Sequence, residues 1–202
     1  MKKKKIGIFI DEGNVWSSYK SMGKLLDYNK FKKYFEKKFS GKLYRIFFYT
    51  AYPKDNTRKY NLDKRHKFFT YLKKELGFAI RKKPLKTIIL KDGEGSVIHD
   101  QKTGKPASIE KGNLDVELTI DAMRFSDEYQ IAIFFSGDSD FLPLISFLRN
   151  SKKKKVYVFS TKSSISKELK SGSDAYFDLL KAKELHGEKL QYRHKRNSPP
   201  TQ

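Results

Sequence analysis

Four aspartates of this sequence are the strongest candidates for chemistry. They are Asp11, Asp115, Asp138 and Asp140. The first follows the apolar run Ile6–Ile10, and the last two follow the apolar run Ile131–Phe135. Both runs are typical of buried parallel strands, and ligands of parallel sheets lie beyond the carboxyl ends of the strands. Asp115 lies in the first turn of a helix expected at Lys111–Phe125, so we expect the carboxylates to converge at one edge of a sheet.

Carboxylates held close together repel one another, and a cation among them makes the arrangement tolerable. The chain has no cysteine, and no histidine lies near these aspartates in sequence, so hard oxygen ligands favour Mg²⁺ or Mn²⁺ over zinc. Such an ion can activate water and stabilise the leaving oxygen in phosphodiester cleavage. The competing interpretation is structural, because Asp138 and Asp140 could also cap the N-terminus of the helix expected at Asp138–Asn150.

Three further residues are candidates for supporting roles. Asn14 lies one turn after Asp11 and could orient a ligand or that carboxylate, or it could cap the first helix. Asp121 lies about 240° around an ideal helix from Asp115, so we expect it to be auxiliary or structural. Lys111 could hold a phosphate, although it is one lysine among many.

The chain is strongly basic, with a formal net charge of +21. The tail 184–202 holds four Lys or Arg and two Glu, so nearly all of this charge belongs to the folded part. The densest stretch is 54–86, with twelve Lys or Arg and three acidic residues. Such a body attracts polyanions, unless most of its lysines are simply solvated. The candidates for nucleic-acid contact are Lys54, Arg58, Lys59, Lys64 and Arg65, with Tyr49, Tyr52 and Tyr60 available to stack bases if they are exposed.

The elements that must position these residues follow from hydrophobic periodicity. Strands are expected at Lys5–Ile10, Leu43–Tyr52, Phe78–Lys82, Gln130–Phe135 and Lys155–Ser160. Helices are expected over 14–39, 56–76, 111–125, 138–150, 164–171 and 176–183, with Asp27 capping the second half of the first. The turn-rich segment 85–108 is expected to be a hairpin-like excursion. This alternation predicts an α/β fold, a single domain with a central, mostly parallel sheet flanked by helices.

The sequence also predicts the organisation of the chain and its compartment. One domain is expected over 1–183, followed by a basic, disordered tail over 184–202. The apolar run after Met1–Lys5 is too short for a signal peptide, and no stretch is long enough to span a membrane. We therefore expect a cytoplasmic protein without a membrane partner. The sequence does not fix the oligomeric state, so a homodimer stays open.

The motifs of the sequence resemble the LabA-like branch of the NYN-domain family, within the PIN-like nuclease superfamily. They are Phe9-Ile10-Asp11-x-x-Asn14, Lys111-Gly112-x-x-Asp115-Val116-x-Leu118-x-x-Asp121 and Ser136-Gly137-Asp138-Ser139-Asp140-Phe141, with a final segment at Ser164–Leu180. The resemblance covers about residues 5–182. It departs in one spacing, because the family has one residue fewer between Lys111 and Asp115. Glu12 occupies a position where the family often has glycine. It could be an additional acidic ligand or simply an exposed side chain.

This resemblance implies a PIN-like (Rossmann-like) fold. It also implies a Mg²⁺- or Mn²⁺-dependent endoribonuclease acting on RNA, with the four aspartates as metal ligands and catalytic residues. An RNA-binding or adaptor module with little turnover is the main alternative, and other nucleic acids remain possible partners. A phosphatase of the haloacid-dehalogenase type is disfavoured, because its second aspartate would occupy position 13, which is glycine.

Overall fold

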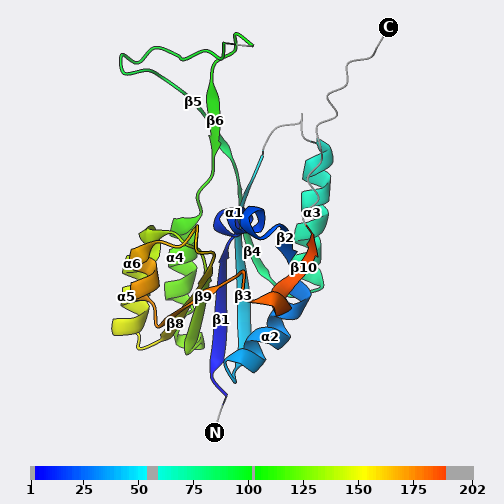
Figure 1. The fold of residues 1–202 in the computed structure, drawn as a ribbon, viewed down its shortest axis with the longest axis vertical. Helices are drawn as coiled ribbons and strands as arrows, with labels where there is room; N and C mark the ends of the chain where they lie inside the picture. The colour runs from blue at the N-terminus through cyan, green and yellow to red at the C-terminus, as the bar shows by residue number, and fades with distance from the viewer. Residues whose placement is uncertain (1–2, 54–58, 102, 190–202) are drawn as a thin grey trace.

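The computed structural model describes residues 3–53, 59–101 and 103–189 of the chain. A sheet of six parallel strands runs through the middle of the molecule in the order β4-β3-β1-β7-β8-β9 (Figure 1). The strands are β1 (Lys5–Asp11), β3 (Lys42–Tyr52), β4 (Ala79–Pro84), β7 (Ile131–Phe135), β8 (Lys155–Ser160) and β9 (Ala175–Asp178). The predicted single α/β domain with a parallel central sheet is confirmed.

Helices cover both faces of this sheet (Figure 1). One face carries α1 (Glu12–Met22), α2 (Phe31–Lys38) and α3 (Lys59–Lys74), and the other carries α4 (Asp115–Arg124), α5 (Leu142–Asn150) and α6 (Lys167–Gly172). Short 3-10 turns are η1 (Tyr28–Lys30), η3 (Ser126–Glu128), η4 (Ser139–Phe141) and η5 (Lys183–Leu185). None of the helices among the described residues has the length and apolar character needed to cross a bilayer.

The central strand β1 is buried on both faces. Ile8 and Ile10 belong to the core under α1–α3, whereas Phe9 belongs to the core under α4–α6. The Phe9 ring stacks between Phe47 of β3 and Phe134 of β7, with centroid distances of 5.1 Å to each. These contacts fix β1 between its neighbours, and with it the position of the residues that follow its carboxyl end.

Two predicted helices are corrected by the structure. The segment 14–39 is not one helix, because α1 ends at Gly23 in the left-handed conformation (φ 62°) and the strand β2 (Lys24–Leu26) follows. The helix predicted over 176–183 is wrong, since Ala175–Asp178 forms the edge strand β9 beside β8. Its pairing partner lies outside the local sequence, so local periodicity does not reveal the strand.

The folded part also extends past the boundary predicted at residue 183. Leu185 is fully buried, and the strand β10 (His186–Lys189) pairs antiparallel with β2. The backbone N–H of Asp27 donates to the carbonyl of Leu185 over 2.8 Å, which joins this segment to the loop before η1. The rest of the predicted tail, 190–202, lies outside the described residues.

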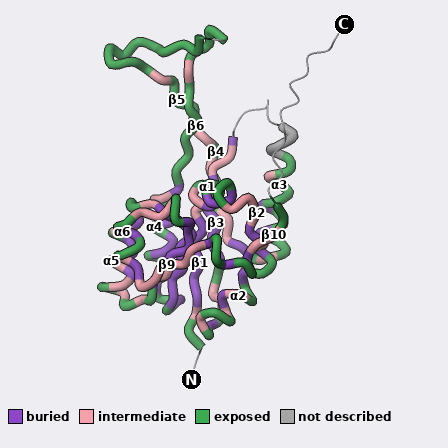
Figure 2. Tube along the Cα trace, viewed as in Figure 1, coloured by how far each residue is buried: buried purple, intermediate pink, exposed green. Residues whose placement is uncertain are grey.

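The predicted excursion is a long hairpin, which we call the hairpin arm (residues 85–111). Its strands β5 (Lys86–Ile89) and β6 (Ser108–Lys111) pair antiparallel, and the arm projects from the body with most of its length exposed (Figures 1 and 2). Both of its roots meet the end of β3. The Leu85 N–H donates to the Tyr52 carbonyl over 2.8 Å, and a Cβ on Gly112 would lie 2.4 Å from the Cβ of Ala51.

Candidate metal centre and acidic cleft

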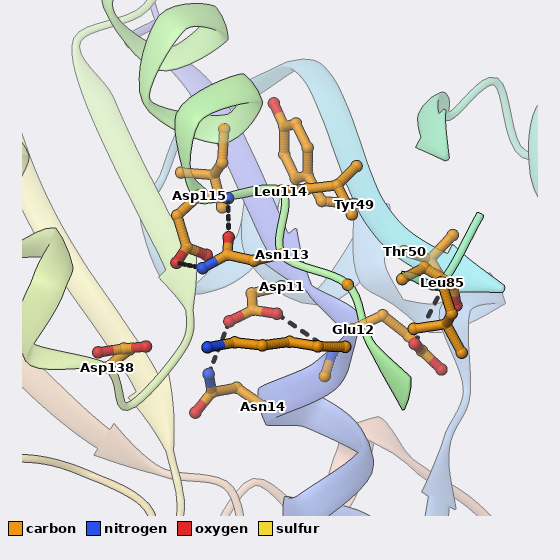
Figure 3. Close-up of a pocket in the computed structure, with 15 residues that line it drawn as sticks. Asp11, Glu12, Asn14, Tyr49, Thr50, Leu85, Asn113, Leu114, Asp115 and Asp138 are labelled. Carbon is orange, nitrogen blue, oxygen red and sulfur yellow. Dashed lines mark hydrogen bonds between the residues drawn. The ribbon is translucent and has the colours of Figure 1, made fainter. Parts of the chain in front are cut away.

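A cavity of about 350 Å³, the acidic cleft, opens at the carboxyl edge of the sheet. Its walls are the ends of β1 and β3, the start of α1, both roots of the hairpin arm, the start of α4, and Asp138 after β7. Figure 3 shows Asp11, Asp115 and Asp138 around a common space. Residues from distant parts of the sequence therefore meet at the place where ligands bind in parallel α/β sheets.

Asp11 is held in place by three hydrogen bonds. It is the N-cap of α1, and its carboxylate accepts from the Gly13 N–H at 3.1 Å. The Asn14 amide donates to it over 2.6 Å and the Ser136 hydroxyl over 3.2 Å. Burial raises the pKa of Asp11 above its ordinary value, and these three donors oppose that rise. The Asp11 carboxylate is therefore held in one orientation.

Asn14 and Ser136 connect the two strands whose ends form the cleft. The Asn14 side-chain oxygen accepts from the Gly137 N–H over 3.1 Å, while its amide donates to Asp11. The Ser136 oxygen accepts from the Asp138 N–H over 3.2 Å. Gly137 has no room for a side chain, because a Cβ there would lie 1.9 Å from the Ser164 carbonyl oxygen. The loop after β7 is therefore fixed relative to the end of β1.

Three of the four predicted aspartates come within reach of one ion. Asp115, Asp138 and Asp140, which we call the carboxylate cluster, each offer an oxygen, and these oxygens all lie within 4.8 Å of one another. Two oxygens that bind one hard cation at 2.0–2.6 Å lie up to about 5 Å apart. The donor set is all oxygen and anionic, so it fits Mg²⁺ or Mn²⁺. Asp11 lines the same cleft but does not belong to this group.

Local hydrogen bonds orient the side chains of the carboxylate cluster. Asp138 caps η4 and accepts from the Asp140 N–H at 3.0 Å. Asp115 opens α4, where the Asn113 side chain accepts from its N–H at 2.6 Å and donates to its carboxylate at 2.5 Å. Burial, followed by the negative charges of Asp11, Asp138 and Asp140, raises the pKa of Asp115 against the opposing bond from Asn113. Asp138 therefore caps η4 and also presents an oxygen to the carboxylate cluster.

Two of the auxiliary candidates, Lys111 and Asp121, lie in different surroundings. Lys111 lines the cleft, but as the last residue of β6 and not as the start of a helix. Asp121 is 4% exposed, and its carboxylate accepts from Arg81 Nε at 2.8 Å and from the Tyr49 hydroxyl at 3.2 Å. This ion pair joins α4 to β4, so the structure gives Asp121 a structural role.

The basic candidates are only partly visible. Lys54 and Arg58 lie outside the described residues, and Lys59 is the first residue of α3. Lys64 is exposed on the same helix. Arg65 donates to Glu12 Oε1 over 2.8 Å, and Glu12 also accepts from Thr50 at 3.1 Å. Glu12 is therefore neither exposed nor a member of the carboxylate cluster.

The aromatic residues considered for base stacking are also sorted by the structure. Tyr49 is 2% exposed and its hydroxyl is bonded to Asp121, so it cannot stack a base. Tyr52, the last residue of β3, is half-buried. The side chain of Tyr60 lies outside the described residues.

Sequence reasoning missed the positioning role of Ser136 and Asn113. Both carried a local signal, since Ser136 precedes the Gly-Asp pair and Asn113 lies two residues before the first helical aspartate. Asn113 also occupies the extra position between Lys111 and Asp115. There it bonds to Asp115 through both ends of its amide, so the longer spacing still ends in a fixed carboxylate.

Comparison with known proteins agrees with the geometry. The family model described as NYN domain matches residues 5–180. The chain is 29% identical over 177 residues to the "Low amplitude and bright protein LabA" of Synechococcus elongatus, covering 87% of this chain and 83% of LabA. It also matches the crystal structure of VPA0982, a protein of unknown function from Vibrio parahaemolyticus, with a TM-score of 0.64 and 23% identity. That match covers 91% of this chain and 96% of the other, and it shows the fold alone.

Proposed function

Because the chain belongs to the NYN domain family, we propose that it is a metal-dependent ribonuclease whose active centre is the carboxylate cluster beside Asp11. The observation that carries this proposal is the set of three carboxylate oxygens within 4.8 Å of one another at the carboxyl edge of the sheet. NYN domains are generally nucleases that use divalent metals, which supports a hydrolase role.

Each residue of the cleft has a distinct part in this proposal. Asp115, Asp138 and Asp140 would hold Mg²⁺ or Mn²⁺, which when bound supplies an activated water and stabilises the leaving oxygen. Asp11 supplies a fixed carboxylate on the inner wall, directed by Asn14 and Ser136. Lys111, at the root of the hairpin arm, supplies a positive charge for the phosphate.

RNA as the substrate is supported by charge and by family. The chain carries a net charge of +21, which favours a polyanion. The basic residues proposed to contact the backbone are Lys54, Arg58, Lys59, Lys64 and Arg65. A cytoplasmic location goes with this proposal, because the substrate would be cellular RNA.

The test is cleavage of single-stranded RNA with Mn²⁺ by the full chain and by Asp138→Asn. Asparagine still caps η4, so this variant removes a charge from the carboxylate cluster and keeps the local structure. The matched control is Asp127→Asn, whose side chain is 82% exposed and precedes the amino end of β7. Loss of a residue that supports a metal ligand typically lowers activity about 10- to 100-fold. We expect Asp138→Asn, which changes a proposed ligand itself, to lose more cleavage activity than that. Asp127→Asn should stay active.

The competing function is an RNA-binding or adaptor module without turnover. It predicts salt-dependent RNA binding that EDTA does not change, with no product formed. Absence of cleavage, or cleavage that Asp138→Asn leaves unchanged, would reject the nuclease proposal.

A further inference from the structure

A second, more apolar hollow adjoins the acidic cleft. It has a volume of about 850 Å³ and lies between α1, β2 and α3. Glu12 and Gly13 line both hollows, so the two lie side by side at the start of α1. We call the second hollow the aromatic groove, after the aromatic residues in its lining, which are Trp16, Tyr19, Tyr28, Phe48 and Phe68. Its volume lies within the range of small-ligand pockets.

The walls of the aromatic groove present ring surface to solvent. Trp16 is 46% exposed and lies edge-on to the Tyr19 ring at a centroid distance of 5.8 Å. Phe68 is 37% exposed and lies 6.0 Å from the Tyr28 ring. Tyr19 and Tyr28 also line the groove but are buried, at 6% and 7% exposed, and their hydroxyls bond to each other at 2.5 Å. Exposed aromatic surface in a hollow is typical of a ligand site.

The charge around the aromatic groove favours an anionic ligand. Lys64 and Arg65 of α3 line it, and the whole chain is strongly positive. Arg65 is paired with Glu12, which fixes the guanidinium at the border between the groove and the acidic cleft. A ligand that combines a planar apolar ring with a phosphate matches both features, and a nucleotide has both.

We propose that the aromatic groove stacks an unpaired base of the strand whose phosphate occupies the acidic cleft. This inference rests on the proposed function and adds a substrate class to it. A base within a duplex is already stacked and paired, so only a single-stranded segment can place a base against Trp16. The protein would therefore select single-stranded RNA over double-stranded RNA.

The chain has one tryptophan, so its fluorescence reports on this groove alone. The experiment titrates single-stranded oligoadenylate into Asp138→Asn in EDTA, with the duplex of the same strand and oligouridylate as the comparison. Cleavage cannot occur under these conditions, so binding is measured independently of activity. We expect saturable quenching of Trp16 by the single strand and little change with the duplex.

Substitutions then connect the signal to stacking. Trp16→Ala should weaken binding of a labelled single strand, measured by anisotropy, about 5- to 150-fold, whereas Trp16→Phe should retain most of the affinity because it keeps a ring. The matched control is Leu180→Ala, since Leu180 is similarly exposed at 42% but follows the edge strand β9. This control should bind as the parent does.

The possible failures are distinguishable. If the single strand binds by anisotropy and Trp16 fluorescence does not change, the aromatic groove is not the base site, and the ribonuclease proposal stands. If Trp16 is quenched but the full chain with Mn²⁺ cleaves nothing, the nuclease proposal fails and the groove assignment stands. A fluorescence change with protein concentration alone would make the groove a contact between copies and overturn the inference.

Discussion

Asp115, a proposed metal ligand, lowers the stability of the metal-free protein. Burial, followed by the charges of Asp11, Asp138 and Asp140, raises the pKa of Asp115, so folding makes ionisation of this carboxyl less favourable than it is in the unfolded chain. A raised carboxyl pKa means that the residue costs the folded state nothing below the unfolded pKa. The cost grows as the pH rises from the unfolded pKa through the folded pKa, and above the folded pKa it is constant. A cation in the carboxylate cluster would remove this cost.

We therefore expect Asp115→Asn to stabilise the metal-free protein by about 0.5–1 kcal/mol at neutral pH, because it removes the charge repulsion and keeps the shape of the side chain. The gain should shrink as the pH falls toward the ordinary carboxyl pKa of 3.8. The measurement is urea unfolding in EDTA at several pH values.

The same variant should lose the stabilisation by Mn²⁺, which for the parent would be about 2.7 kcal/mol at a hundred times the dissociation constant. Asp127→Asn is the control, and it should keep that stabilisation. An Asp115→Asn protein stabilised by Mn²⁺ as strongly as the parent would contradict the role of Asp115 as a ligand.

At the scale of residues, the sequence indicated which aspartates gather at the edge of the sheet, but not that Asp11 lies outside the carboxylate cluster. Asp11, Asp138 and Asp140 could be found because each follows a buried strand. The hydrogen bond from Ser136 to Asp11 depends on β1 lying beside β7, which no local pattern encodes. Trp16 was missed for a similar reason, since its exposure depends on where α3 packs.

At the scale of elements, Asp174 ties α5 and β8 to the start of β9. Its carboxylate accepts from the Val156 N–H at 2.8 Å, from Lys155 at 3.1 Å and from Arg149 at 3.2 Å. Burial acts to raise the pKa of Asp174, but these partners outweigh it and hold the pKa below 3.8. A lowered carboxyl pKa gives stability that is complete above the unfolded value and is lost as the pH falls through the folded value.

Asp174→Asn should accordingly cost about 1–2 kcal/mol at neutral pH, because charge-assisted hydrogen bonds are lost. The difference from the parent should vanish in acid, once the parent carboxylate is protonated. Chemical denaturation across this pH range measures it. A constant difference at every pH would show that packing, and not the charge, is responsible.

The hairpin arm should be removable without loss of the domain. Ile89 pairs with Ser108, so residues 90–107 can be replaced by Asn-Gly, which suits a two-residue hairpin turn. We expect the midpoint of thermal unfolding to stay within about 3 °C of the parent, since the deleted residues are mostly exposed. Deletion of 85–112, which removes both roots, is the comparison and should impair the acidic cleft. Unfolding of the shorter deletion would refute this view of the arm.

The elements were predictable where their signal was local. Ile131–Phe135 is a continuous apolar run and was recognised as a central strand. The break after Met22 was not recognised, because it depends on the left-handed Gly23 and on the pairing of β2 with a strand at the end of the folded chain. Lys111 was placed at a helix start because the pairing of β6 with β5 is likewise invisible in a local window.

At the scale of the whole molecule, the net charge of +21 makes a prediction about binding. RNA affinity should fall linearly with salt on a log–log plot, with a slope of about −0.7 for each phosphate neutralised on a single strand. Fluorescence anisotropy over a salt series measures the slope. A peptide nucleic acid of the same base sequence has no phosphates, so its affinity should depend very little on salt. Salt-independent RNA binding would mean that charge does not drive the encounter.

The hairpin arm has a mechanical consequence. Its two roots, at Leu85 and Lys111, both meet the acidic cleft, and the second continues through Gly112 and Asn113 into Asp115. The peptide chain therefore runs from the arm directly into Asp115, one of the proposed metal ligands. A molecule bound at the tip of the arm would be linked to the acidic cleft through these two roots, without touching the cleft itself.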